Sequence, residues 1–146
     1  MQVDAVEEVD PASLTPPPRL LVVDDATVER LALSHYLRKN GYDVIEAEDG
    51  RSAVLHLKSL QIDLLLLDLN MPHGDGFTVL NYLQEHRRSL PVILLSGMPL
   101  NEIQHKMHRL HERELPPLML KPVDPEQLIQ VVELQLGGGP TEAEGK

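Results

Sequence analysis

Four polar segments of the sequence follow directly after short apolar runs, and their side chains could bind a cation and an anion. These segments are Asp24-Asp25, Asp68, Ser96-Gly97 and Lys121-Pro122. If the apolar runs are parallel strands of one sheet, the polar segments lie together at its carboxyl edge, where such sheets bind ligands. Three carboxylates, a hydroxyl and an ammonium group would then share one shallow site.

The carboxylates of such a site require a cation. Like charges about 4 Å apart repel by roughly 4 kcal/mol at an effective dielectric constant of 20, so Asp24, Asp25 and Asp68 repel one another unless a cation joins them. A ligand set of oxygen atoms without histidine or cysteine suits a hard divalent ion, and we expect Mg²⁺. Lys121 and Ser96 would then face an anionic group, and a phosphoryl group fits that description.

The elements that must position these residues alternate between strands and helices. Three runs are apolar on consecutive positions, as strands buried on both faces require: Leu20–Val23, Leu64–Leu67 and Val92–Leu95. Tyr42–Ala47 and Leu118–Leu120 are weaker strand candidates that suit flanking positions.

Apolar residues with helical spacing lie after each of these strands. The five sets are Ala32, Leu33, Tyr36 and Leu37; Ala53, Val54 and Leu57; Val79, Leu80 and Leu83; Leu100, Ile103, Met107 and Leu110; and Leu128, Ile129 and Val132. Gly41 marks the end of the first helix and Pro125 the first turn of the last. Five strands alternating with five helices predict a parallel α/β sheet with right-handed crossovers and helices on both faces.

Composition excludes several classes of protein. The chain has 146 residues, enough for one domain with its own core, and a net charge of −10. It has no cysteine, which excludes disulfides, a thiolate nucleophile and a zinc knuckle. The four aromatic residues and the negative charge argue against nucleic-acid binding. No apolar stretch approaches the roughly 20 residues of a membrane span, so we expect no membrane and a cytoplasmic location.

The two ends of the chain differ in composition from its middle. Residues 1–18 hold four acidic residues and the run Pro16-Pro17-Pro18, so we expect a flexible leader. Residues 137–146 begin with three glycines and a proline, and we expect a disordered tail. One folded domain is therefore expected over residues 19–136.

Three strings extend the interpretation to a family. LLVVDDATVERLALSHYL, DLLLLDLNMPHGDGF and LMLKPVD resemble the receiver domain of bacterial two-component response regulators, and the resemblance covers residues 19–136. It implies a single flavodoxin-like (βα)5 domain, a doubly wound parallel sheet with strand order 2-1-3-4-5. It also implies that the chain catalyses no reaction beyond its own phosphorylation and dephosphorylation.

The resemblance assigns an acceptor and metal ligands. Asp68 would accept a phosphoryl group from a histidine of a sensor kinase or phosphotransfer protein. Asp25 and Asp68 would ligate Mg²⁺ directly. Asp24 would act through water, and Asn70 would contribute its backbone carbonyl.

The same resemblance assigns the remaining site residues and the partners. Ser96 would donate a hydrogen bond to the phosphoryl group, Lys121 would pair with it, and the peptide bond before Pro122 would be cis. Gly76 would permit the tight entry into the third helix. A downstream protein would bind the face of the fourth helix, fifth strand and fifth helix, and a phosphorylation-dependent homodimer is left open.

Two features depart from the family pattern. Leu118 stands where the family usually has an aromatic residue that reports phosphorylation, three positions before the lysine. The segment between Ser96 and Lys121 has 24 residues, a few more than is usual, and Glu114-Leu115-Pro116-Pro117 stands before the fifth strand in place of the family's usual Gly-Ala step. We therefore expect the switch to act through loop and backbone shifts.

Simpler roles remain open for the same residues. Asp24 and Asp25 could cap the first helix, Asp68 could be a turn acid, and Lys121 could be a solvated lysine. The chain could also be a pseudo-receiver binding module, or a small Mg²⁺-dependent phosphohydrolase with an aspartate nucleophile. Asn70 argues against the hydrolase, because such enzymes commonly need an acid two positions after the nucleophile.

The remaining polar residues have ordinary interpretations. His105, His108 and His111 have a spacing that could hold a metal, but a solvated helix face is favoured. His73 is expected to be exposed in a loop. Arg87-Arg88 is expected to complement the dipole of the third helix.

Overall fold

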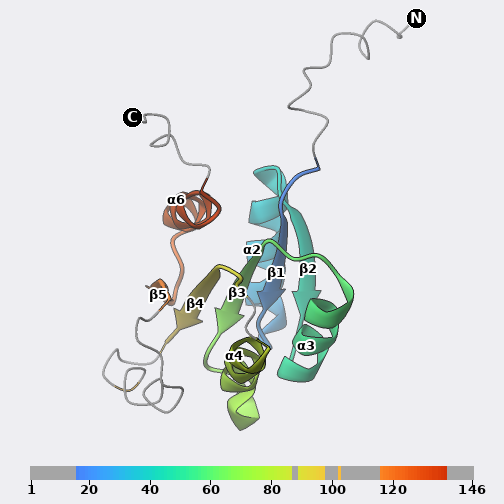
Figure 1. Cartoon of the computed structure of the whole chain (residues 1–146). Helices are drawn as coiled ribbons and strands as arrows, with labels where there is room; N and C mark the ends of the chain where they lie inside the picture. The colour runs from blue at the N-terminus through green and yellow to red at the C-terminus, as the bar shows by residue number, and fades with distance from the viewer. Residues whose placement is uncertain (1–15, 87–88, 98–101, 103–115, 138–146) are drawn as a thin grey trace, which may run out of the picture.

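A five-stranded parallel sheet forms the centre of the molecule. The computed structural model describes residues 16–86, 89–97, 102 and 116–137. The strands are β1 (Arg19–Val23), β2 (Asp43–Ala47), β3 (Leu64–Asp68), β4 (Val92–Ser96) and β5 (Leu118–Leu120). Their order across the sheet is β2-β1-β3-β4-β5 and every pairing is parallel (Figure 1). The predicted strands and the predicted strand order are confirmed.

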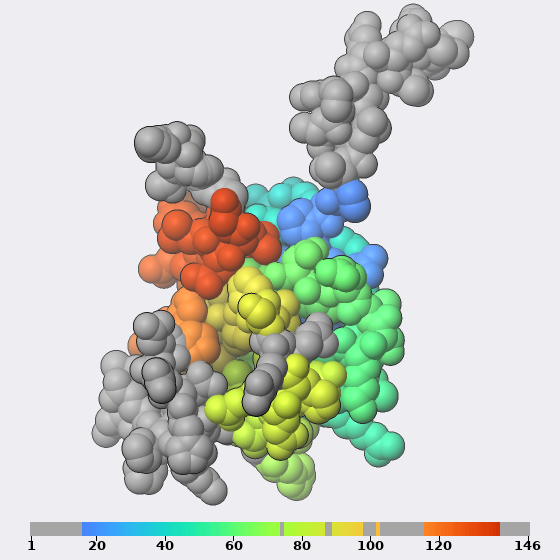
Figure 2. Space-filling model, viewed as in Figure 1, coloured from blue at the N-terminus to red at the C-terminus, as the bar shows by residue number. Residues whose placement is uncertain are grey.

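The helices follow the strands along the chain. They are α2 (Thr27–Lys39), α3 (Gly50–Ser59), the 3₁₀ turn η2 (Pro72–Gly74), α4 (Asp75–Glu85) and α6 (Pro125–Gln135). α3 and α4 lie side by side, as Figure 2 shows, and α2 contacts α6. These two pairs belong to different core clusters, so the sheet has a helical layer on each face.

Each central strand is buried on both faces because its apolar residues are consecutive. In β1, Leu21 and Val23 pack into the core beneath α3 and α4, whereas Leu20 and Val22 pack into the core beneath α2 and α6. All four side chains are completely buried. An alternating pattern would have left one face of the strand in water.

The apolar face expected for α2 is partly wrong. Leu37 is fully buried and Leu33 packs, partly buried, against the same core, but Tyr36 is only half-buried and Ala32 is exposed. The helix packs on the sheet through Leu37 and the small residue Ser34, which rotates Ala32 away from the core. Ala32 lines a cavity of about 230 Å³ between α2 and the start of α6 instead.

The ends of the helices follow the local sequence. Gly41 adopts a φ of 96° just after α2, a conformation that favours glycine, and Pro125 opens α6. The alternative role of Asp24 and Asp25 as helix caps is wrong, because Ala26 is the N-cap of α2 and no side chain caps it.

Several predictions lie outside the described residues. They concern the fourth helix with Leu100, Ile103, Met107 and Leu110, the three histidines His105, His108 and His111, the pair Arg87-Arg88, and most of the expected leader and tail. Within the described ranges, none of the helices combines the length and apolar character needed to cross a membrane.

Candidate functional site

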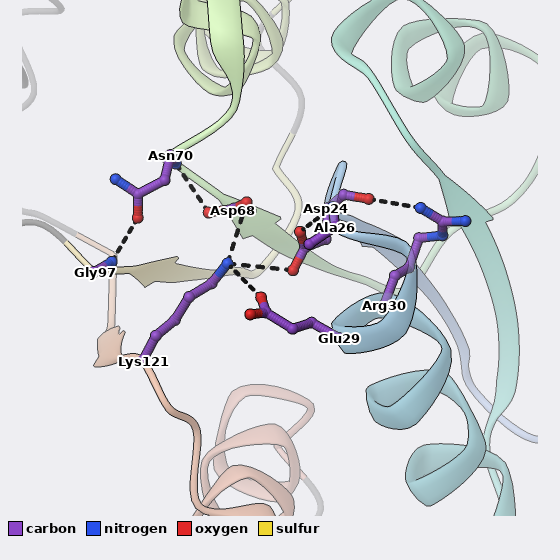
Figure 3. A network of polar contacts seen from close by, with 8 residues as sticks. All are labelled: Asp24, Ala26, Glu29, Arg30, Asp68, Asn70, Gly97 and Lys121. Atoms are coloured by element: carbon purple, nitrogen blue, oxygen red, sulfur yellow. Dashed lines mark hydrogen bonds and ion pairs between the residues drawn. The ribbon is translucent and has the colours of Figure 1, made fainter.

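The carboxyl ends of β1, β3 and β5 bring residues from distant parts of the chain into one site. Lys121 Nζ lies 3.2 Å from Asp68 Oδ2 and 3.3 Å from Asp24 Oδ2 (Figure 3). The strands end in line because the parallel register pairs Val23 with Leu67 and Ser96 with Leu120. The convergence expected from the sequence is therefore present.

Asp68 is the last residue of β3 and lies at the floor of the site. It is 1% exposed, because β3 has strand neighbours on both sides and a helical layer on each face. Its Oδ1 accepts a hydrogen bond of 2.8 Å from the backbone N–H of Asn70, and its Oδ2 faces Lys121. The two oxygens thus have different neighbours.

Asp24 is completely buried and is held on three sides. Its backbone N–H donates to the carbonyl of Ala47, and its Oδ1 accepts from the N–H of Ala26 at 2.9 Å. Its own carbonyl accepts from Nη1 of Arg30, whose Nε also pairs with Glu46 at 2.9 Å. These contacts fix the direction of the Asp24 carboxylate toward Lys121.

The acidic residues form a cluster that fits a metal ion. Asp24, Asp25 and Asp68 each offer a carboxylate oxygen, and these oxygens lie within 4.8 Å of one another. Asp24 and Asp68 are buried, whereas Asp25 is exposed, so a cation can approach from solvent on the side of Asp25. A donor set of oxygen atoms alone suits Mg²⁺.

The loops after β3 and β4 are joined by Asn70. Its side-chain Oδ1 accepts a hydrogen bond from the backbone N–H of Gly97, next to Ser96 (Figure 3). Ser96 is fully buried at the end of β4, and its carbonyl accepts from the N–H of Lys121 at 2.8 Å. Hydrogen bonds thus connect the loop after Asp68 with the chain segments that carry Ser96 and Lys121.

Burial and neighbouring charges shift the pKa values of the two central groups. Burial raises the pKa of Asp68 to about 6, and Asp24 adds to this rise, while the Asn70 N–H and Lys121 oppose it. Burial alone would lower the pKa of Lys121, but Glu29, Asp68 and Asp24 outweigh it and raise that pKa. At neutral pH both side chains are therefore charged for most of the time.

Two backbone features match the sequence expectations. The Lys121–Pro122 peptide bond is cis. At Gly76, a Cβ atom would lie 2.8 Å from the carbonyl oxygen of Asp68, so only glycine fits where α4 passes behind the acceptor. His73 is exposed as expected, with a φ of 62° in the left-handed region.

Sequence reasoning missed one residue of the site. Glu29, in the first turn of α2, places Oε1 3.0 Å from Lys121 Nζ. The two residues are 92 positions apart, and an acid in the first turn of a helix is common for its effect on the helix dipole. The sequence therefore held no signal that separated Glu29 from an ordinary surface acid.

Comparisons with known proteins agree with this geometry. A model of the response regulator receiver domain matches residues 20–133. The chain is 46% identical over 94 residues to the sensor protein EvgS of Escherichia coli O157:H7, which covers 62% of this chain and 8% of EvgS. It is 38% identical over 81 residues to the chemotaxis protein CheY of Bacillus subtilis, covering 55% of this chain and 68% of CheY.

Solved structures agree as well. A response regulator receiver protein from Pseudomonas putida superposes with a TM-score of 0.72 and 31% identity, over 83% of this chain and 99% of that one. Several of the curated relatives are much longer, and the chain spans 8% to 23% of their length. The match to the family model covers most of the chain, so this protein belongs to the response regulator receiver domain family.

Proposed function

We propose that this chain accepts a phosphoryl group on Asp68 from a phosphohistidine and passes the signal on through protein contacts. One observation carries the proposal: the buried Asp68 carboxylate lies 3.2 Å from Lys121 and within a cluster of three acids that suits Mg²⁺. Asp24 and Asp68 both contact the ammonium, and of these two acids Asp68 is the one at the end of the central strand β3.

In the proposed step an oxygen of Asp68 attacks the phosphorus of the donor. An O–P bond forms, the P–N bond to the donor imidazole breaks, and that nitrogen takes a proton from solvent. Asp68 must be ionised to attack, and a pKa of about 6 leaves it mainly ionised at neutral pH. Lys121 would neutralise the phosphoryl oxygens and Ser96 would donate a hydrogen bond to them.

Asp25 and Asp68 would hold Mg²⁺ directly, with Asp24 acting through water and Asn70 through its carbonyl. When bound, the ion supplies the positive charge that neutralises the transferring phosphoryl group. The chain's own residues position the nucleophile and hold the compensating ammonium. The proposal includes no second substrate and no reaction other than phosphorylation and dephosphorylation of Asp68.

Partners and boundaries belong to the same proposal. A sensor kinase or phosphotransfer protein would supply the phosphoryl group, and relatives named as sensor proteins support this class of partner. A downstream protein would bind the face that includes β5 and α6. We propose that the receiver domain spans residues 19–136, with residues 1–18 and 137–146 outside it.

Phosphorylation of the full chain tests the proposal. The chain is incubated with acetyl phosphate and Mg²⁺, and its intact mass is measured. We expect a phosphoryl adduct that is lost in Asp68→Asn and retained in Asp63→Asn, a matched change just before β3, at the opposite end of that strand from Asp68. Turnover of external phosphoesters would identify a hydrolase instead, and absence of any adduct would identify a binding module that is not phosphorylated.

A further inference from the structure

Lys121 is held by a third carboxylate that lies outside the metal-binding cluster. Glu29 Oε1 is 3.0 Å from Lys121 Nζ, compared with 3.2 Å for Asp68 and 3.3 Å for Asp24. Asp24 and Asp68 are buried members of the cluster, whereas the Glu29 side chain is 57% exposed and belongs to α2. Figure 3 shows Lys121 reaching between Asp68 and Glu29.

The charges around Lys121 change when a cation occupies the cluster. A divalent ion offsets two of the three negative charges of Asp24, Asp25 and Asp68 and weakens their attraction for Lys121, so Glu29 becomes the strongest remaining partner among the carboxylates that contact Lys121. A phosphoryl group on Asp68 carries up to about two negative charges and needs the same ammonium. Glu29 and the phosphoryl group therefore compete for Lys121.

The structure also leaves room for Glu29 to release Lys121. Both side chains line the cavity of about 230 Å³ between α2 and the start of α6. The Glu29 carboxylate can turn toward this space or toward solvent without moving the helix, since it lies on a long, exposed side chain. The ion pair between Glu29 and Lys121 is thus a contact that can break when Lys121 turns to a phosphoryl group on Asp68.

We propose that Glu29 is a positioning residue that restrains Lys121 in the unphosphorylated site and so weakens the binding of phosphoryl-like anions. The inference rests on the proposed function, because it concerns the same site. This restraint also makes the environment of α2 depend on phosphorylation, because the first turn of that helix loses its ion pair to Lys121 when Asp68 carries a phosphoryl group.

The test is a pair of binding titrations on the full chain and on Glu29→Gln. Dissociation constants are measured by amide chemical shifts, first for Mg²⁺ alone and then for beryllofluoride in saturating Mg²⁺. We expect Glu29→Gln to bind beryllofluoride about two- to fivefold more tightly, the size of an exposed ion pair. We expect Mg²⁺ to bind about twofold more weakly, because the full charge of Lys121 then opposes the cation.

The opposite signs separate this role from a structural one. Loss of a favourable interaction with the helix dipole would lower the melting temperature without moving the two constants in opposite directions. Glu85→Gln, which removes the same charge from the last residue of α4, serves as the matched control and should change neither constant.

Three outcomes would count against the inference. If wild type binds both ligands and Glu29→Gln has the same constants, or weaker anion binding, the inference is overturned while the proposed function stands. If both constants move in the same direction, Glu29 affects the fold of the site rather than Lys121, and the inference is overturned. If wild type binds neither Mg²⁺ nor beryllofluoride, the proposed function and the inference fail together.

Discussion

Asp68 combines deep burial with a charge that its proposed chemistry requires. Its carboxylate is 1% exposed and has another acid, Asp24, beside it, which together raise its pKa to about 6. The Asn70 N–H and the Lys121 ammonium limit this rise. Burial of the ionised carboxylate therefore lowers the stability of the folded state. Binding of Mg²⁺ to the site would restore part of that stability.

Replacing Asp68 by asparagine should stabilise the metal-free fold at neutral pH. The folded-state pKa lies above the unfolded value of 3.8, so between about pH 4 and pH 6 the folded state binds more protons than the unfolded state. The free energy of unfolding of wild type consequently falls as pH rises through this window. At about pH 7.5, Asp68→Asn should be more stable by roughly 1–3 kcal/mol, because it has no charge to bury.

Urea unfolding in the presence of a chelator measures this difference. The gap between Asp68→Asn and wild type should narrow as the pH is lowered through 6 toward 4, because the buried carboxyl of folded wild type is then protonated and carries no charge. Asp63→Asn is the control and should show no such stabilisation at neutral pH. A gap that is independent of pH, or a less stable Asp68→Asn at neutral pH, would contradict the account of Asp68.

Asp25 provides a separate test of the metal cluster. It is exposed but lies beside two other carboxylates, so Asp25→Asn should leave the metal-free melting temperature unchanged or slightly higher, because it relieves their repulsion. Mg²⁺ at ten times its dissociation constant should add about 1.4 kcal/mol to the stability of wild type. Asp25→Asn should need at least about tenfold more Mg²⁺ for the same increase in stability. Loss of a residue that only supports a metal ligand already weakens metal binding about tenfold, and Asp25 is proposed to bind the ion directly.

Thermal unfolding over a series of Mg²⁺ concentrations gives the comparison. Glu48→Gln removes an exposed acid that is outside the cluster and should respond to Mg²⁺ as wild type does. An Asp25→Asn variant that is stabilised at the same Mg²⁺ concentration as wild type would exclude Asp25 as a ligand.

At the scale of elements, the consecutive apolar runs predicted the sheet and the polar residues after them predicted the site. Leu64–Leu67 is apolar at every position, and a run this short between polar residues suits a strand buried on both faces. Once the strands are parallel, Asp24, Asp68 and Lys121 must lie at one edge, which the ion pairs confirm.

The helices were less predictable than the strands. α2 has apolar residues over more than one face, and the sequence does not say which of them will meet the sheet. Leu37, Ser34 and, in part, Leu33 do so, while Ala32 faces the cavity. Glu29 was missed for a related reason, because its contact with Lys121 depends on how α2 is rotated and on the position of β5.

The entry of α4 behind the acceptor depends on a close backbone approach. In Gly76→Ala the new Cβ would lie 2.8 Å from the Asp68 carbonyl oxygen, which should destabilise the fold by about 1–3 kcal/mol. Gly97→Ala is the matched control, because its Cβ would have Asn70 Oδ1 at 3.6 Å as the nearest atom and should change stability by less than about 0.5 kcal/mol.

Chemical denaturation of both variants checks this prediction. Equal stability of the two variants would mean that α4 can shift away from β3 at no cost, and the glycine would then have another role.

At the scale of the whole molecule, the sheet separates two cores that are both needed for stability. Leu66 is fully buried in the core beneath α2 and α6, so Leu66→Ala should cost about 2–5 kcal/mol. Leu120 is 58% exposed at the end of the edge strand β5, and Leu120→Ala should cost less than about 0.5 kcal/mol. Urea titrations measure both costs, and a large cost for Leu120 would contradict the burial described for β5.

The exposed edge of the molecule is also where the output face is proposed. Leu118 is half-buried against the core beneath α3 and α4 and pairs with Leu94 across the sheet, so it fills space where the family usually has an aromatic residue. Leu120 and Leu134 are exposed on β5 and α6, on the part of this face that the structure describes. The sequence identified the departure at Leu118 but could not show how the side chain packs.

The central claim is that Asp68 alone receives the phosphoryl group, and chemical mapping of the modified residue tests it most directly. The full chain is phosphorylated by a phosphohistidine donor with Mg²⁺ and then reduced with borohydride, which converts an aspartyl phosphate to homoserine. Peptide mass spectrometry should find homoserine at position 68 and nowhere else. Homoserine at another acid, or a phosphorylated chain with an unmodified Asp68, would contradict the account.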